Sequence, residues 1–172
     1  LSLSITDAPV DNALEVMVQF DGVELNPANG DPITIIYNQP KRIDLLALTG
    51  GVTEFLLENE SLPAGRYTWI RLQVDEANSY IDVGAGQEPL RIPSGAQTGL
   101  KLNRGFTVAE NGSVAFTIDF DLRKSVHNAP GSGFHLRPTL RITEESVTGA
   151  LAGSVDPTLI ASKCAGSDNG GV

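Results

Sequence analysis

The chain has 172 residues and a mass of 18.2 kDa, which suits one domain with a sizeable core and leaves no room for a second full domain. Its composition, 41% hydrophobic and 19% charged, is that of a folded globular protein and excludes a disordered one. The formal net charge of −9 argues against nucleic acid or an anionic membrane surface as a partner, because attraction to phosphate requires positive charge.

Short runs in which every second residue is apolar recur along the chain, and the 18 glycines and 10 prolines fall between these runs. This pattern predicts about eight to ten short strands separated by turns. In one such run, Val16, Val18 and Phe20 form a single face. The apolar stretches at 41–51 and 53–59 are too short to distinguish strand from helix by period, so we expect at most one short helix there.

A turn at residues 63–65 is followed by the clearest strand of the sequence. Its buried face is predicted to carry four alternating residues: Thr68, Ile70, Leu72 and Val74. Tyr67, Trp69 and Arg71 then lie on the outward face. Aromatic and guanidinium groups side by side can form a stacking platform for a sugar or for a partner protein. The equally strong alternative is that a second layer or a loop covers them.

Residues 114–142 contain both histidines of the chain. Alternating apolar residues at 114–122 and again at 134–142 predict the two strands of a hairpin whose turn is centred near Asn128. A slip of one residue would expose the apolar face of one strand to water, which supports this register.

The outward face of this expected hairpin is charged. Asp121 would face His135, and Asp119 would face Arg137. Opposite charges across a strand pair contribute about 0.2–1 kcal/mol each, so this face needs no ligand to explain it. The alternative is a site for a cation or a polar ligand, formed by Asp119, Asp121, His127 and His135. The structural interpretation is favoured, because a flat sheet face brings ligands together less closely than metal sites usually do.

Other candidate sites have weaker support. Asp7, Asp11, Glu15 and Asp21 carry the oxygen atoms that calcium prefers, but they lack the spacing of a calcium-binding loop, which favours an acidic turn in solvent. The single cysteine, Cys164, rules out a disulfide within these residues. The sequence contains no nucleophile-elbow, zinc-protease, phosphate-loop or dinucleotide motif. We therefore expect no enzyme and no cofactor, with calcium as the one ion worth testing.

The predicted fold is an all-β, antiparallel Greek-key sandwich of immunoglobulin-like or transthyretin-like type, spanning residues 1–147. After residue 147 the composition changes to one weak apolar stretch and a tail rich in Gly, Ser, Asp and Asn. We expect residues 148–172 to be a linker or the start of a truncated second β domain.

Four blocks of the sequence, at 1–25, 42–51, 62–75 and 119–142, resemble the bacterial family known as domain of unknown function 4382. The resemblance extends over about residues 1–147. It implies an exported, often lipid-anchored surface protein, an extracytoplasmic location and a non-enzymatic role. In that family a lipid-attachment cysteine precedes the domain and a second, carboxypeptidase-regulatory-like β domain often follows it. The family supplies no catalytic residues.

We therefore expect a structural or adhesive module, at the cell surface or secreted, that binds other proteins or copies of itself. Exposed strand edges allow self-association by strand addition. Contact with a membrane is expected only through an anchor outside these residues. The alternative function is the binding of carbohydrate or a divalent cation, through the face of Trp69 or through that of Asp119, Asp121 and His135.

Overall fold

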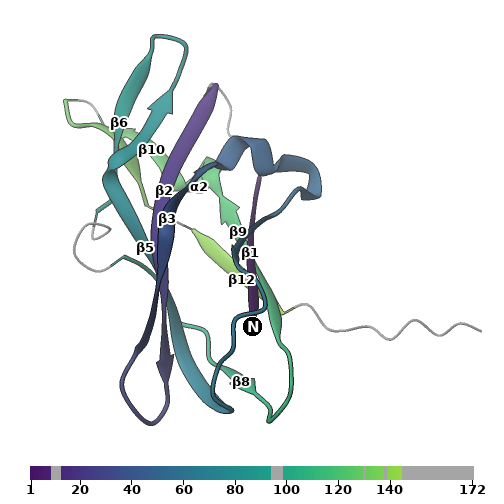
Figure 1. The fold of residues 1–172 in the computed structure, drawn as a ribbon. Coiled ribbons are helices and arrows are strands. Elements are labelled where there is room, and N and C mark those ends of the chain that lie inside the picture. Colours follow the sequence, from purple (N-terminus) through teal and green to yellow (C-terminus); the bar gives the residue numbers. More distant parts are fainter. Residues whose placement is uncertain (9–12, 94–98, 130, 138, 145–172) are drawn as a thin grey trace, which may run out of the picture.

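The computed structural model describes residues 1–8, 13–93, 99–129, 131–137 and 139–144. Two β-sheets pack against each other, with loops and hairpins extending beyond them (Figure 1). The expected all-β sandwich is confirmed. The predicted linker or second domain, at 148–172, lies outside the described residues.

The smaller sheet has the strand order β12-β9-β1-β4. These strands are β12 (Leu140–Glu144), β9 (Ala115–Asp121), β1 (Ser2–Ala8) and β4 (Glu54–Leu57). β1 runs parallel to β9, while the other two pairs are antiparallel.

The larger sheet has the order β10-β11-β6-β5-β2-β3, and two further strands, β7 and β8, also pair with β5. The bounds are β10 (Val126–Ala129), β11 (Gly133–Leu136), β6 (Gln87–Arg91), β5 (Gly65–Asp82), β2 (Glu15–Pro27), β3 (Ile33–Asp44), β7 (Leu100–Leu102) and β8 (Phe106–Val108). β6 and β11 are parallel, and the remaining pairs are antiparallel.

Two details differ from the expectation. The sheets are mixed instead of wholly antiparallel, because alternation determines which face of a strand is buried but not the direction of its neighbours. The described residues contain twelve strands, more than the eight to ten expected. The three-residue strands β7 and β8 account for part of this difference, since such short segments show almost no alternation.

Two short helices interrupt the strands: the 3-10 helix η1 (Leu45–Gly51) and α2 (Leu122–Ser125). η1 agrees with the expectation of at most one short helix in the stretches 41–51 and 53–59. Asp44 caps it, since its Oδ1 accepts hydrogen bonds from the backbone N–H groups of Leu46 and Val16, both at 3.1 Å. Neither helix in the described part of the chain has the length and apolar character that crossing a bilayer requires.

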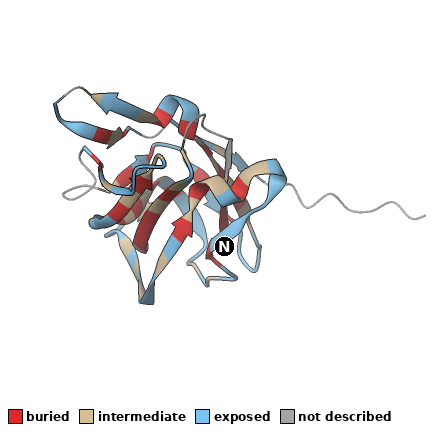
Figure 2. Cartoon of the chain, turned by 90° about the horizontal axis from the view of Figure 1, so that it is seen from above, coloured by how far each residue is buried: buried red, intermediate tan, exposed pale blue. Residues whose placement is uncertain are grey.

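The core forms where the apolar faces of the two sheets meet, and Figure 2 shows the buried residues gathered in the middle of the molecule. Phe116 and Ile118 of β9 and Leu136 of β11 are almost fully buried, and Leu140 of β12 packs against them as a partly buried residue. The expected inward faces of these strands are therefore confirmed.

Bulges shift the alternation within the two longest strands. In β2 the pairing with β3 shifts between Phe20 and Gly22, so that the buried positions move from even to odd numbers. A side chain at Gly22 would place its Cβ 2.4 Å from the Ile35 carbonyl oxygen, so only glycine fits this approach.

In β5 the pairing with β2 shifts again, because residues 76–79 form an outward loop. Ser79 closes this loop. Its Oγ donates to the carbonyl of Asp75 at 2.6 Å and accepts the N–H of Gln19 at 3.1 Å.

Candidate functional site

The face of β5 that was expected to carry Tyr67, Trp69 and Arg71 is only partly as predicted. Trp69 and Arg71 lie on the outer face, with Trp69 opposite Asn26 in β2, but Tyr67 is 1% exposed and lies in the core. The outward placement of Tyr67 was wrong because Thr68 forms a bulge, so that Trp69 and Tyr67 pair with successive residues of β2.

Tyr67 instead supports the core beneath this face. Its ring stacks on Phe106 of β8, with centroids 4.9 Å apart, and its hydroxyl donates to the Pro63 carbonyl at 3.0 Å. Burial raises the pKa of Tyr67 above its ordinary value. The role of Tyr67 is therefore to anchor β8, and the stacking platform loses one of its three expected members.

Trp69 lies beside two cations. The Arg71 guanidinium carbon and the Lys101 ammonium nitrogen are each 4.6 Å from the centroid of the indole ring. Arg71 also donates from Nη1 to Glu24 Oε2 at 2.7 Å. Both cations are within cation–π distance of the indole, and the outer surface presents them beside the aromatic ring.

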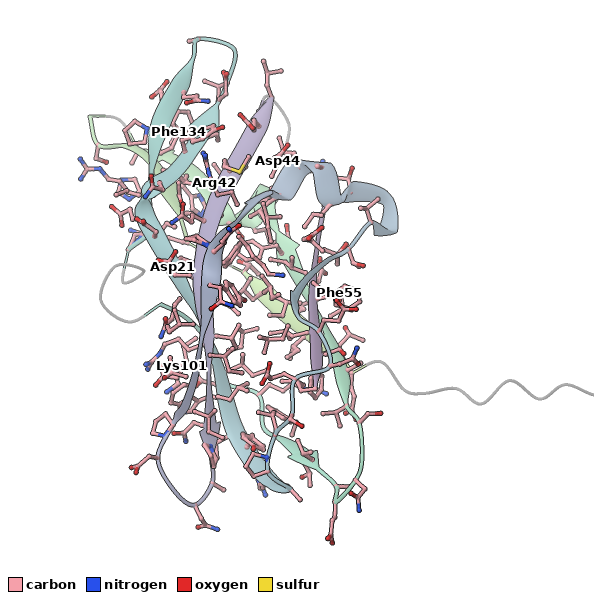
Figure 3. All side chains as sticks on the ribbon, in the orientation of Figure 1. Asp21, Arg42, Asp44, Phe55, Lys101 and Phe134 are labelled. Carbon is pink, nitrogen blue, oxygen red and sulfur yellow. The ribbon has the colours of Figure 1, made fainter. Side chains whose placement is uncertain are left out.

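Lys101 also lines a cavity of about 240 Å³ between β7 and β12. The lining consists of Lys101, Leu102, Asn103, Arg104, Leu140 and Ile142, with no acidic residue among them. Figure 3 shows Lys101 on the side of β5 that faces away from the smaller sheet. We name Trp69, Arg71, Lys101 and Arg104 the basic cluster.

The expected hairpin of residues 114–142 does not form. β9 pairs with β12, where Asp119 is the partner of Arg141 instead of Arg137. The chain leaves the smaller sheet after Asp121, makes the single turn of α2, and enters the larger sheet as β10. The predicted contact of Asp121 with His135 is therefore wrong, because the two residues belong to different sheets.

Asp121 caps α2 instead of facing His135. Its Oδ1 accepts the N–H of Lys124 at 3.3 Å, and its Oδ2 pairs with the Lys124 ammonium at 2.5 Å. The hydrogen bond from the Lys124 side chain is the largest influence that lowers the pKa of Asp121, with a smaller contribution from Arg141. Asp121 therefore holds the start of α2 in place, a contact that differs from the cross-strand pair expected from the sequence.

The structure does bring the two histidines together. His127 of β10 and His135 of β11 are direct partners in an antiparallel pair. His135 Nε2 lies 3.1 Å from Ser132 Oγ, while its buried Nδ1 has no hydrogen-bond partner among the described residues. Arg91 of β6 is the partner of His135 on the other side. The four-residue cation site is thus divided, since Asp119 and Asp121 lie in or at the end of the smaller sheet.

The acidic residues considered for calcium are also dispersed. Asp7 lies in β1 of the smaller sheet and Glu15 in β2 of the larger one, while Asp11 and Cys164 lie outside the described residues. Within the described ranges, no three His, Cys, Asp or Glu side chains form a group that could hold a metal ion.

A cavity of about 720 Å³ does contain carboxylates, from Asp21, Asp75 and Glu76. These groups already accept hydrogen bonds from the protein. The Gln19 amide donates to Asp21 at 3.0 Å and to Asp75 at 3.2 Å, and the backbone N–H of Ile92 donates to Glu76 at 3.1 Å. Their contacts hold the 76–79 loop in place.

A further surface, which the sequence reasoning did not single out, is the free edge of β3. This strand pairs with β2 on one side and ends the order of the larger sheet. Ile36 is 61% exposed there, and the buried Tyr37 hydroxyl has no hydrogen-bond partner among the described residues. Lys41 donates to the Phe55 carbonyl of β4 at 2.6 Å and joins the two sheet edges.

The sequence carried a signal for each missed feature. Lys101 alternates with Leu100 and Leu102, the pattern of a strand with one buried face, although the run is very short. Residues 32–40 form an uncharged stretch of nine, bounded by Asp31 and Lys41, that marks an unusual edge strand.

The protein is therefore an all-β sandwich of two mixed sheets. Its candidate binding surfaces are the free edge of β3 and the basic cluster. The chain belongs to the family described as Domain of unknown function (DUF4382), whose model matches residues 1–138. No curated protein and no solved structure matches it. The resemblance stated from the sequence is thereby confirmed.

Proposed function

We propose that the protein is a non-enzymatic binding module, at the cell surface or secreted, that associates with a second copy of itself through the free edge of β3. The observation that carries this proposal is the uncharged segment of β3, residues 33–36, at the outer edge of the larger sheet. A free edge presents unpaired N–H and C=O groups, which an added strand can satisfy.

The chemistry of this edge favours a second copy as the occupant. Two molecules that each carry a net charge of −9 repel one another, so they approach most easily where the surface is uncharged. Two β3 strands in antiparallel pairing would be related by a two-fold axis and would join the larger sheets of both copies. Ile36, 61% exposed, would then be covered.

A bulge limits the length of this contact. Gly22 pairs with Ile36 and Phe20 pairs with Lys41, so one residue of β2 opposes four residues of β3 between them. The regular free edge is therefore confined to residues 33–36. A docking strand of this length makes few hydrogen bonds, and the proposed association is weak and dependent on concentration.

Membership of the family supports the proposed location. The sequence resemblance associates family members with export and with lipid anchoring, and we extend both properties to this protein. The two cations beside the Trp69 indole favour an anionic ligand over a neutral carbohydrate at this face. The separation of Asp119 and Asp121 from His127 and His135 disfavours the divalent-cation alternative.

Sedimentation velocity over a range of concentrations tests the proposal. The wild type is expected to form dimers as concentration rises, and Ile36→Lys is expected to remain monomeric because it places a charge at the edge. Leu14→Lys is the matched control, since Leu14 is 71% exposed at the other end of β2, and it should dimerise like the wild type.

Circular dichroism checks that both variants fold. A wild type that stays monomeric at the highest soluble concentration contradicts the proposal. So does an Ile36→Lys variant that is folded and still dimerises.

A further inference from the structure

We propose that the cavity beside the basic cluster binds the acidic group of an anionic saccharide, a carboxylate or a sulfate carried on a single sugar residue. This site is on the β7 side of the larger sheet, and the inference is independent of the β3 edge.

The first support is a pair of like charges held together. Arg71 of β5 and Lys101 of β7 are direct partners across an antiparallel pair. Like charges in such positions destabilise a sheet. Here the Trp69 indole, 4.6 Å from each cation, and the Glu24 carboxylate, which pairs with Arg71, offset the repulsion.

The second support is a lack of counter-charge around the cavity. Among the described residues, no carboxylate forms an ion pair with Lys101 or Arg104, although the protein has 21 acidic side chains. Two cations, with no carboxylate among the lining residues that the structure describes, create a local positive potential on an acidic protein. An anion that enters is bound by charge-assisted hydrogen bonds from both side chains.

The remaining lining indicates what carries the anionic group. Asn103 supplies an amide that can pair with hydroxyl groups, while Leu140 and Ile142 supply an apolar wall for C–H groups. This mixture matches a sugar, which has both kinds of surface. The volume, about 240 Å³, is below the range of about 300–1,000 Å³ typical of drug-sized ligand sites, so the cavity suits one sugar residue.

The size of the site also argues against a long acidic peptide. The first 60 positions carry 10 acidic and 2 basic residues and the whole chain has a net charge of −9, so the protein as a whole repels a polyanion that extends beyond the cavity. A single acidic sugar residue, or the end of a chain of them, meets the positive charge without this repulsion.

Intrinsic fluorescence provides a direct readout, because Trp69 is the only tryptophan of the chain. The intact protein is titrated with glucuronate, glucose sulfate, unmodified glucose, an oligoglucuronate and a tetraglutamate peptide. Glucuronate or glucose sulfate, or both, should change the emission with saturation, and glucose should bind about tenfold more weakly or not at all. Calorimetry should confirm each affinity.

Three variants separate a local site from a general charge effect. Lys101→Gln and Arg104→Gln should each weaken binding of the acidic sugars about tenfold or more, because each substitution removes one charge-assisted hydrogen bond. Arg42→Gln removes the same charge from β3 and should leave the affinity unchanged. Calorimetry measures the affinity of Lys101→Gln even if that substitution alters Trp69 emission. Circular dichroism verifies that each variant folds.

Several results overturn the proposal. The proposal fails if neither acidic sugar binds with saturation, or if glucose binds as tightly as the acidic sugars. It also fails if tetraglutamate binds as tightly as the acidic sugars, or if Arg42→Gln weakens binding as much as Lys101→Gln does. A difference between glucuronate and glucose sulfate identifies the preferred anionic group. Equal affinity per molecule for glucuronate and its oligomer supports a site for one sugar residue.

Discussion

Ser79 and Ser125 make the same pair of hydrogen bonds in different parts of the molecule. Each hydroxyl donates at 2.6 Å to the carbonyl of an aspartate four residues earlier. Each also accepts a backbone N–H from a distant segment, that of Gln19 at 3.1 Å for Ser79 and that of Thr139 at 2.9 Å for Ser125. Both serines are buried. Each one closes a local departure from the strand and ties it to another part of the chain.

Replacement of either serine by alanine should destabilise the protein by about 1–3 kcal/mol, because each buried hydroxyl makes two hydrogen bonds and the Gln19 N–H that Ser79 accepts is left buried without a partner. Urea unfolding of Ser79→Ala and Ser125→Ala measures this loss. Ser132→Ala is the control, since Ser132 is exposed and should change the free energy of unfolding by less than about 0.5 kcal/mol. Equal effects at all three positions would contradict the assigned roles.

Tyr67 should behave as a core residue and not as a surface residue. Tyr67→Ala is expected to lower the free energy of unfolding by about 3–5 kcal/mol, the range for a large buried aromatic side chain. Tyr67→Phe should cost about 0.5–1.5 kcal/mol through loss of the hydrogen bond to Pro63. Thr107→Ala, an exposed position next to Phe106, is the control and should cost little. A Tyr67→Ala variant as stable as this control would contradict the burial of Tyr67 and would support its predicted position on the outer face of β5.

The ion pair of Asp121 should make stability depend on pH in the acidic range. The folded-state pKa of Asp121 is lowered by Lys124, so its contribution is complete above the ordinary aspartate pKa of about 3.9. That contribution is lost as the pH falls through the lower folded value. Asp121→Asn should therefore be less stable than the wild type at pH 7 and approach it in strong acid. Urea unfolding of both proteins across this range measures the difference, and a gap that stays constant down to the lowest pH would contradict the prediction.

The sequence predicted well those features that depend on alternation alone. The inward faces of β9 and β11 follow from the pattern of apolar residues. For residues 41–51 and 53–59 the sequence allowed at most one short helix, which agrees with η1, but it did not give the bounds of that helix. Alternation is local, and burial enforces it wherever a strand is regular. The all-β sandwich could therefore be recognised without coordinates.

The errors came from short departures from regular strand structure, of one to four residues, which the alternation of apolar residues does not reveal. One bulged residue, Thr68, reversed the side on which Tyr67 lies. One turn of helix after Asp121 moved the following residues to the other sheet, so that Asp119 pairs with Arg141. The sequence of α2 has no helical period, because four residues complete barely one turn. Lys101 and Arg104 were missed because their cavity depends on β12 lying beside them, a long-range relationship.

The parallel pairing of β1 with β9 imposes an order on the assembly of the molecule. The hydroxyls of Ser4 and Thr117 are 2.9 Å apart, yet 113 positions separate the two residues. During synthesis β1 can pair with β4, and β2, β3 and β5 can join as they emerge, but the other edge of β1 must wait for β9, which is made much later. Closure over such a distance is slow. We expect the joining of β9 to β1 to limit the rate of refolding, and the smaller sheet of the newly made chain to remain open and accessible to chaperones until then.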